Sequence, residues 1–361
     1  MEQKKERSRS VCRPRQEELD DAALLSRIIS LLRFPLIVGI VCIHAGVPES
    51  VVSAVGSHAV YDFVHEWSAQ VVARVAVPLF FLISGYLFFL NVERLTLAAY
   101  GHKLWKRVRT LFVPYVWWNV AAVLVAWLFH TYVFHLRSAV PHWDLSHWLS
   151  VWWDYRGGMP YNYPLWYIRN LMLMAVAAPL QWWLLKRLPR PVLLLTGVWW
   201  LLSGGNAATT VFFFMLGAWL GIGKRSFGWA LWRLARPAGL LYVMWSVVEA
   251  GWGREFMPSV FHQLGIVLGA VCVMGLAARY VVHGGRQWKW LQASSFWIYA
   301  THVIVLGLTQ TWLFRSYRPE SDIELLLVFM AQIAWPVGAG AALYALMHKC
   351  LPRLTAWLTG G

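Results

Sequence analysis

A series of apolar runs near 20 residues long dominates this 361-residue sequence. A run of that length crosses the hydrocarbon core of a bilayer as a helix, because the core is about 30 Å thick and a helix rises about 1.5 Å per residue. Hydrophobic residues make up 59% of the chain and charged residues 14%, against about 25% charged in soluble domains. The sequence therefore predicts an all-α, polytopic membrane bundle of about ten transmembrane helices, at 29–47, 73–92, 109–131, 165–185, 191–205, 208–223, 237–252, 260–281, 294–314 and 324–347.

The basic residues favour a topology with both termini in the cytoplasm. With the N-terminus inside, most of the 32 Lys and Arg fall in segments on the cytoplasmic side, the usual bias of membrane proteins. We interpret 1–26 as a charged cytoplasmic N-terminal tail, 27–350 as the transmembrane domain and 351–361 as a short cytoplasmic C-terminal tail. The net charge of +15 is then explained by topology, and we expect no nucleic-acid partner.

Two ionisable residues share one face of the first expected span. Arg33 and His44 are 11 residues apart, which places them on the same side of a helix and about 16 Å apart along its axis. Ionisable groups inside a membrane are costly and tend to mark a functional path, and histidine suits general-base catalysis. Alternatively, Arg33 extends to the cytoplasmic interface while His44 makes a structural hydrogen bond.

A dense basic cluster precedes the third expected span, in KLWKRVRTLFVPY at residues 103–115. Arginine and lysine bind phosphate, arginine often through two hydrogen bonds. A phosphorylated cofactor or the anionic headgroups of membrane lipids would both suit this cluster. Its members are Lys103, Lys106, Arg107 and Arg109.

Other side chains are candidates for substrate contacts or for stabilising an oxyanion. Ser84 adjoins Gly85 in a notch that suits helix packing better than nucleophilic catalysis, because no G-x-S-x-G elbow surrounds it. Tyr299 and His302 share a helical face, and Glu66 or Asp62 would orient His44 from the segment 48–72. The full set is Ser84, Trp166, Asn170, Tyr299, His302 and Glu66.

Two segments expected outside, 48–72 and 132–164, mix aromatic rings with carboxylates or histidines. Such a mixture suits stacking on sugar faces, and it is also typical of the aromatic belt at the headgroup level. The four cysteines lack the spacing of metal ligands, so we expect no metal site.

In their order, these motifs resemble the acyltransferase-3 family of integral-membrane acyltransferases, which includes O-antigen and other surface-glycan O-acetylases. The matching features are Arg33 with His44, VPLFFLISGYLFF, the basic cluster ending in Pro114, LWYIRNLMLM and FWIYATH. The resemblance implies a protein of the bacterial cytoplasmic (inner) membrane that transfers an acyl group from cytoplasmic acyl-CoA, usually acetyl-CoA, to a glycan hydroxyl at the outer face.

Carried onto this sequence, the resemblance makes His44 the catalytic histidine and Arg33 its partner. Lys106 and Arg109 match the family's paired basic residues for the CoA phosphates, although lysine here replaces the first arginine. The expected partners are the glycan acceptor, membrane lipids and possible polysaccharide-synthesis proteins.

Two other classes of function are also compatible with these motifs. Arg33 and His44 on one face would also serve a proton-coupled permease or exporter of glycans or lipid-linked sugars. A non-catalytic scaffold would use the aromatic segments to hold a synthase. Within the enzyme hypothesis, the acyl group is acetyl or succinyl, and His44 acts either as a general base or as a nucleophile that carries the acyl group.

Overall fold

The computed structural model describes residues 20–133, 144–154, 157–252 and 259–361, and every regular element in these ranges is helical. The all-α membrane bundle predicted from the apolar runs is confirmed. Short 3-10 turns lie at η2 (Ala73–Val75) and η6 (Tyr163–Leu165), and π-helical stretches lie at η1 (Glu66–Val72), η3 (Val108–Phe112) and η4 (Phe129–Val133). The α-helices are α2 (Asp21–His44), α3 (Glu49–Val52), α4 (Ala59–His65), α5 (Ala76–Phe89), α6 (Leu97–Arg107), α7 (Val113–Leu128), α8 (Leu145–Trp152), α9 (Trp166–Val176), α10 (Ala178–Arg187), α11 (Pro189–Ser203), α12 (Asn206–Ile222), α13 (Gly228–Trp252), α14 (Ser259–Val282), α15 (Lys289–Ser316), α16 (Asp322–Cys350) and α17 (Pro352–Thr359).

Six helical stretches within the described residues are long and apolar enough to cross a membrane. They are 21–44, 59–89, 97–133, 259–282, 289–316 and 322–350. The expected span 165–185 is instead broken between α9 and α10, which meet at an angle of 64° and make a seventh crossing if the pair is one span. Pro179 at the start of α10 explains the break, because proline has no N–H for the preceding turn and its ring crowds that turn. A total of ten spans stays a prediction.

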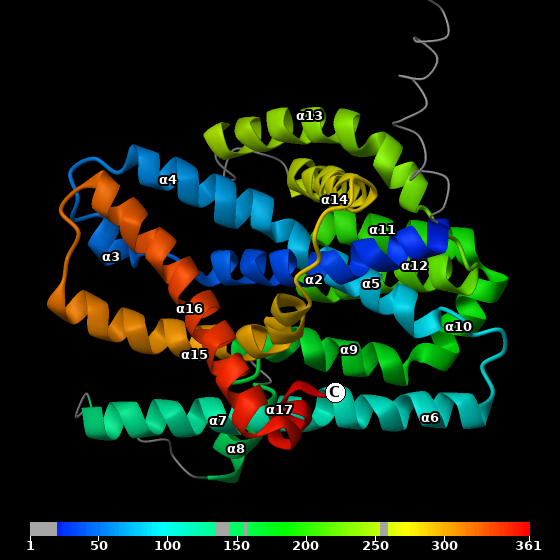
Figure 1. The fold of residues 1–361 in the computed structure, drawn as a ribbon, viewed down its shortest axis with the longest axis horizontal. Coiled ribbons are helices and arrows are strands. Elements are labelled where there is room, and N and C mark those ends of the chain that lie inside the picture. The colour runs from blue at the N-terminus through cyan, green and yellow to red at the C-terminus, as the bar shows by residue number, and fades with distance from the viewer. Residues whose placement is uncertain (1–19, 134–143, 155–156, 253–258) are drawn as a thin grey trace, which may run out of the picture.

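Helix α2 runs through the middle of the bundle (Figure 1). It contacts α14 on one side and α15 on the other, and it also packs against α5. Its side chains are apolar around much of the helix, and Leu24, Ile28 and Val41 are completely buried. The helix that carries Arg33 and His44 is therefore held by several neighbours rather than by one face.

Glycines let α5 and α12 pack with their backbones in contact. A Cβ at Gly85 would lie 2.1 Å from Phe214 O, and a Cβ at Gly217 would lie 2.0 Å from Leu82 O. No side chain fits at those distances, so the small-residue notch at Ser84–Gly85 serves helix packing through its glycine. The neighbouring Ser84 instead contacts the hydroxyl of Tyr167, as described below.

Helical structure extends beyond the predicted spans in three places. Helix α2 begins at Asp21 rather than after residue 26, because Leu24 and Leu25 pack into the core and Asp21 Oδ1 accepts the Trp229 N–H at 2.8 Å. Much of the segment 48–72 is helical, in α3, α4 and η1. The carboxylate of Asp322 accepts two N–H groups at the start of α4 and so stabilises that helix.

The third difference is at the C-terminus, where 351–361 contains a docked helix rather than only a tail. Helix α17 packs against α7, and Trp118 Nε1 donates to Leu358 O at 3.0 Å. Gly360 has a φ of +77°, and a Cβ there would lie 2.3 Å from Thr110 O. The end of the chain thus fits closely against the start of the third span.

Candidate active site

His44 lies at the end of α2, where its ring is packed between two other rings. The ring of His302 stacks on it with centroids 5.3 Å apart and an interplanar angle of 27°. The ring of Tyr163 meets it edge-on at 4.9 Å. The structure therefore brings together two of the histidines singled out in the sequence, from the first span and from α15.

The turn that follows His44 is held by two amide side chains from different helices. Gln310 Nε2 donates to Gly46 O at 3.1 Å, and the Gly46 N–H donates to Gln332 Oε1 at 3.2 Å. The two glutamines also bond to each other at 2.7 Å. Because α15 and α16 each contribute one of them, these bonds fix where α2 ends.

His302 is completely buried and has one ring nitrogen in a defined hydrogen bond. Its Nδ1 lies 2.6 Å from Tyr299 O. Because a carbonyl oxygen only accepts, Nδ1 is the donor, and in the neutral ring Nε2 is then an acceptor. Among the described residues Nε2 has no partner. An unpartnered acceptor beside His44 is the type of group that holds a proton or a hydroxyl in place.

A cavity of about 420 Å³, here called the narrow cavity, runs along one face of α2. Arg33, Ile37, Ile40 and His44 all line it, with the spacing of a single helical stripe. The face shared by Arg33 and His44 is therefore the wall of one cavity. Other residues on its wall include Ser84, Leu111, Trp166, Tyr167, Phe296, Tyr299 and Thr359.

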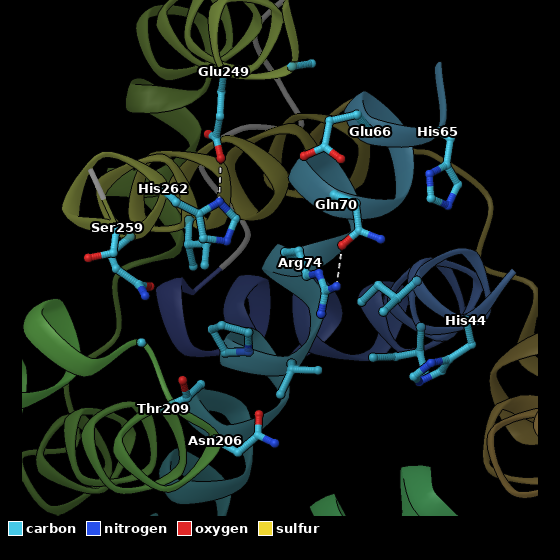
Figure 2. Close-up of a pocket in the computed structure, with 18 of the residues that line it drawn as sticks. His44, His65, Glu66, Gln70, Arg74, Asn206, Thr209, Glu249, Ser259 and His262 are labelled. Atoms are coloured by element: carbon cyan, nitrogen blue, oxygen red, sulfur yellow. Dashed lines mark hydrogen bonds and ion pairs between the residues drawn. The ribbon is translucent and has the colours of Figure 1, made fainter. Parts of the chain in front are cut away.

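His44 also lines a larger cavity of about 1340 Å³, here called the wide cavity. His44 and Trp166 line both cavities. Figure 2 shows polar side chains converging on the wide cavity from several helices, with Glu249 and His262 on one wall and Arg74, Gln70 and Glu66 on another. His44 therefore lies where the two cavities meet, together with Ile40, Val77 and Trp166, and the wide cavity has the larger number of polar side chains on its wall.

The basic cluster divides into two parts. Lys103 Nζ donates to Phe88 O at 2.8 Å and lies 5.1 Å from the centre of the Phe88 ring. The Arg107 guanidinium lies over the same ring at 5.5 Å. Lys103 therefore satisfies a carbonyl in the C-terminal turn of α5, where carbonyls lack helical partners, and Arg107 packs on the ring of the same residue. Lys106 and Arg109 are exposed.

The exposed pair lies beside an element that reaches the narrow cavity. Arg109 belongs to η3, and Leu111 of the same π-helix lines the narrow cavity. Single π-helical turns occur often at functional sites, where they redirect side chains.

The remaining candidates are placed in three different environments. Ser84 Oγ lies 3.0 Å from the hydroxyl of Tyr167 on the narrow cavity wall, and Tyr299 is there too, donating its hydroxyl to Pro164 O. Glu66 lines the wide cavity, where its Oε1 has no partner among the described residues. Asn170 lies apart from both cavity linings and bonds to Arg169 and Thr210.

Glu66 and His44 both line the wide cavity, and a role for Glu66 in orienting His44 stays a prediction. The two rings described above are the partners that pack on the His44 imidazole. For Asn170, the contact with the Arg169 guanidinium and the 3.0 Å bond to Thr210 Oγ1 account for its burial. Both residues therefore differ in position from His302, which lies directly against His44.

Several polar residues on the wide cavity were not predicted from the sequence. Arg74 donates to Gln70 Oε1, and His262 Nδ1 pairs with Glu249 Oε1. Glu249 is 1% exposed and lies in an otherwise apolar stretch of α13. A carboxylate inside an apolar span is costly enough to mark a functional site, so that signal was available in the sequence.

Comparison with known proteins identifies the family of the chain. The acyltransferase-3 family model, described as an acyltransferase domain, matches residues 27–346. The chain belongs to the acyltransferase-3 family. It is therefore a multi-pass membrane acyltransferase, as the resemblance of its motifs implied.

One named relative aligns over nearly the full length of both proteins. The Succinoglycan biosynthesis protein ExoH of Rhizobium meliloti (strain 1021) is 26% identical over 358 residues, which is 94% of this chain and 93% of that protein. No solved structure matches this chain.

Proposed function

We propose that the protein transfers an acyl group from cytoplasmic acyl-CoA to a hydroxyl of a cell-surface or exported glycan, with His44 at the transfer point. The observation that carries this proposal is that His44 lines both cavities. A transferase that joins substrates from opposite sides of a membrane needs a reactive group that both can reach.

The narrow cavity suits the thioester arm of the donor. Its wall follows α2 from Arg33 to His44, about 16 Å along the helix axis, and it is mostly apolar between them. The pantetheine arm of CoA is long and thin, so it would lie in this space with its thioester near His44. Lys106 and Arg109, exposed beside η3, would bind the CoA phosphates through charge-assisted hydrogen bonds.

In the proposed reaction, His44 removes the proton of the acceptor hydroxyl as that oxygen attacks the thioester carbonyl. The new bond joins the acyl carbon to the acceptor oxygen, and the bond between the acyl carbon and sulfur breaks. The proton held by His44 then passes to the thiolate, so the products are an ester and free CoA. The stacked ring of His302 would keep the His44 imidazole in its reactive orientation.

A glycan acceptor is supported by the relative and by the wide cavity. The name of the relative refers to succinoglycan biosynthesis. The wide cavity exceeds the range of about 300–1,000 Å³ typical of small-molecule sites, and carboxylate, amide and hydroxyl side chains line it. Such a space suits a large, hydroxyl-rich acceptor. The acyl group is proposed to be acetyl, with succinyl as the alternative, and the location to be the bacterial inner membrane.

The test is a transfer assay with purified protein in lipid nanodiscs. Acetyl-CoA and succinyl-CoA, each labelled in the acyl group, are offered with de-esterified succinoglycan fragments or with total surface glycan of the host as acceptor. Base-labile label in the glycan supports the proposal, and the preferred donor identifies the acyl group. Label that stays on CoA with every acceptor would overturn it.

A second measurement separates the two roles open to His44. Protein incubated with labelled donor and no acceptor is quenched in acid and digested. Label recovered on the peptide that contains His44 would replace the general-base step with a covalent acyl-histidine. If the quenched enzyme carries no label, the result supports direct transfer from the thioester to the acceptor, with His44 as general base.

A further inference from the structure

The wide cavity contains a buried polar wall that the proposed transfer step does not use. Glu249 of α13 is 1% exposed, and Gln263 of α14 is 5% exposed. Both side chains line the wide cavity, away from the end of α2. Burial of a carboxylate and an amide among apolar helices carries a free-energy cost unless their polar atoms are satisfied.

One oxygen of each side chain has no partner within the described part of the chain. His262 Nδ1 contacts Glu249 Oε1, whereas Glu249 Oε2 has no hydrogen bond. Gln263 Oε1 has none either. Buried oxygens of this kind are normally bonded, so a group that donates hydrogen bonds is expected to occupy this wall.

The surrounding backbone keeps both side chains in place. Gly204 ends α11 with a φ of +60°, and a Cβ there would lie 2.4 Å from Gln263 Nε2. A Cβ at Gly265 would lie 3.0 Å from Glu249 Oε2 and 2.7 Å from Trp245 Nε1. Trp245 Nε1 is a donor that also lacks a partner in the described residues. An unpartnered donor therefore lies beside an unpartnered acceptor.

A hydroxyl group is the chemical match for this arrangement, because it donates one hydrogen bond and accepts others. It would donate to Glu249 Oε2 or Gln263 Oε1, two oxygens without partners among the described residues. A carboxylate or phosphate on the ligand would be repelled by Glu249. Sugars carry several neutral hydroxyls on one ring, which fits two acceptor oxygens on adjacent helices.

We propose that Glu249 and Gln263 form a sugar-binding subsite for the acceptor glycan, with His262 holding the Glu249 carboxylate. The inference rests on the proposed function, because it assumes a glycan in the wide cavity. The subsite binds a neutral sugar ring of the acceptor while another hydroxyl of the same glycan reaches His44. It determines which acceptor is accepted, and it takes no part in the chemistry of transfer.

The test measures binding without turnover. The His44→Ala protein in nanodiscs is titrated with labelled, de-esterified succinoglycan fragments and, separately, with fragments of the host's total surface glycan. Glu249→Gln and Gln263→Met are then added in that background. Because a hydrogen bond to a charged group contributes about 1.5–3 kcal/mol, Glu249→Gln should weaken glycan binding about tenfold or more.

A matched control comes from α10. Gln181 is 4% exposed and also has a buried Oε1 without a partner in the described residues, but it lines neither cavity. Gln181→Met should leave glycan binding unchanged, whereas Gln263→Met should weaken it several-fold. Thermal unfolding and CoA binding of each variant show whether the fold and the donor site are intact.

The outcomes separate the subsite from the proposed function. Weaker glycan binding by the Glu249 and Gln263 variants alone, with unchanged CoA binding, supports the subsite. If the parent binds glycan and these variants bind it equally well, the subsite is wrong while the proposed function stands. If the His44→Ala parent binds none of the glycans and the wild type acylates none of them, both proposals fail.

Discussion

Gly217→Ala should destabilise the protein, because α12 lies directly on the backbone of α5. A Cβ at residue 217 would be 2.0 Å from Leu82 O and 2.8 Å from Leu82 C. Ordinary contact for a Cβ begins near 3.4 Å. The helices must therefore separate locally by about 1.4 Å, and the atoms in the way are backbone atoms that cannot rotate aside.

The expected magnitude follows from two opposing effects. Forcing an extra methyl group into a packed interior costs about 1–3 kcal/mol. Alanine recovers up to about 1 kcal/mol relative to glycine inside a helix. A net loss of about 1–2 kcal/mol is expected for Gly217→Ala. Gly39→Ala is the matched control in α2, because its Cβ would lie 3.6 Å from Ala76 Cβ and should leave stability unchanged or raise it.

Both variants would be purified in the same detergent and unfolded by heat while tryptophan fluorescence is followed. The prediction is a lower midpoint for Gly217→Ala and an equal or higher one for Gly39→Ala. Equal midpoints for the two variants would refute the close backbone packing of α5 and α12. Acyl transfer measured alongside should fall in Gly217→Ala, because α5 also carries the Ser84 wall of the narrow cavity.

Three other predictions concern the site and its surroundings. His302→Phe keeps an aromatic ring against His44 but removes the acceptor nitrogen Nε2. If that nitrogen helps to hold the reacting proton or hydroxyl, kcat should fall about tenfold or more while the KM for acyl-CoA changes little, and an unchanged kcat would show that only the stacked ring matters. Replacing Lys106 and Arg109 with glutamine should raise the KM for acyl-CoA several-fold, because these two residues are proposed to bind the CoA phosphates. Lys103→Gln should mainly lower the unfolding temperature, since Lys103 bonds to the end of α5. A higher KM for Lys103→Gln and a lower unfolding temperature for the double variant would contradict the separation of the cluster into a structural and a binding part. Deleting 352–361 removes Thr359 from the wall of the narrow cavity and the bond from Trp118 to Leu358 O, so melting temperature and donor affinity should both fall. A deletion with wild-type values would show that α17 is dispensable.

Much of the helical bundle was predictable because bilayer-length apolar runs leave few alternatives to helices. The shared face of Arg33 and His44 was predictable for a similar reason, since helical periodicity alone determines it. The break between α9 and α10 was missed because hydropathy takes no account of the missing N–H of Pro179. Local pattern therefore identified spans better than it identified bends within them.

The composition of the site depended on contacts between distant helices. His302 was a candidate, but its stacking on His44 joins α15 to α2 and has no signal in either segment alone. The separation of Lys103 from Lys106 likewise depends on where α5 ends. Glu249 has a signal in the sequence, as an acid within an apolar stretch, but its pairing with His262 joins α13 to α14 and has none in either helix alone.

The most direct test of the central proposal is acyl transfer by membranes that contain equal amounts of wild type, His44→Ala or His283→Ala. His283 is an exposed histidine bonded to Arg279 O, away from both cavities, and serves as the control. With labelled acetyl-CoA or succinyl-CoA as donor, wild type and His283→Ala should place base-labile label in glycan, and His44→Ala should place none. Equal transfer by all three proteins would contradict the role given to His44, and glycan moved across the membrane without any ester would identify a transporter instead.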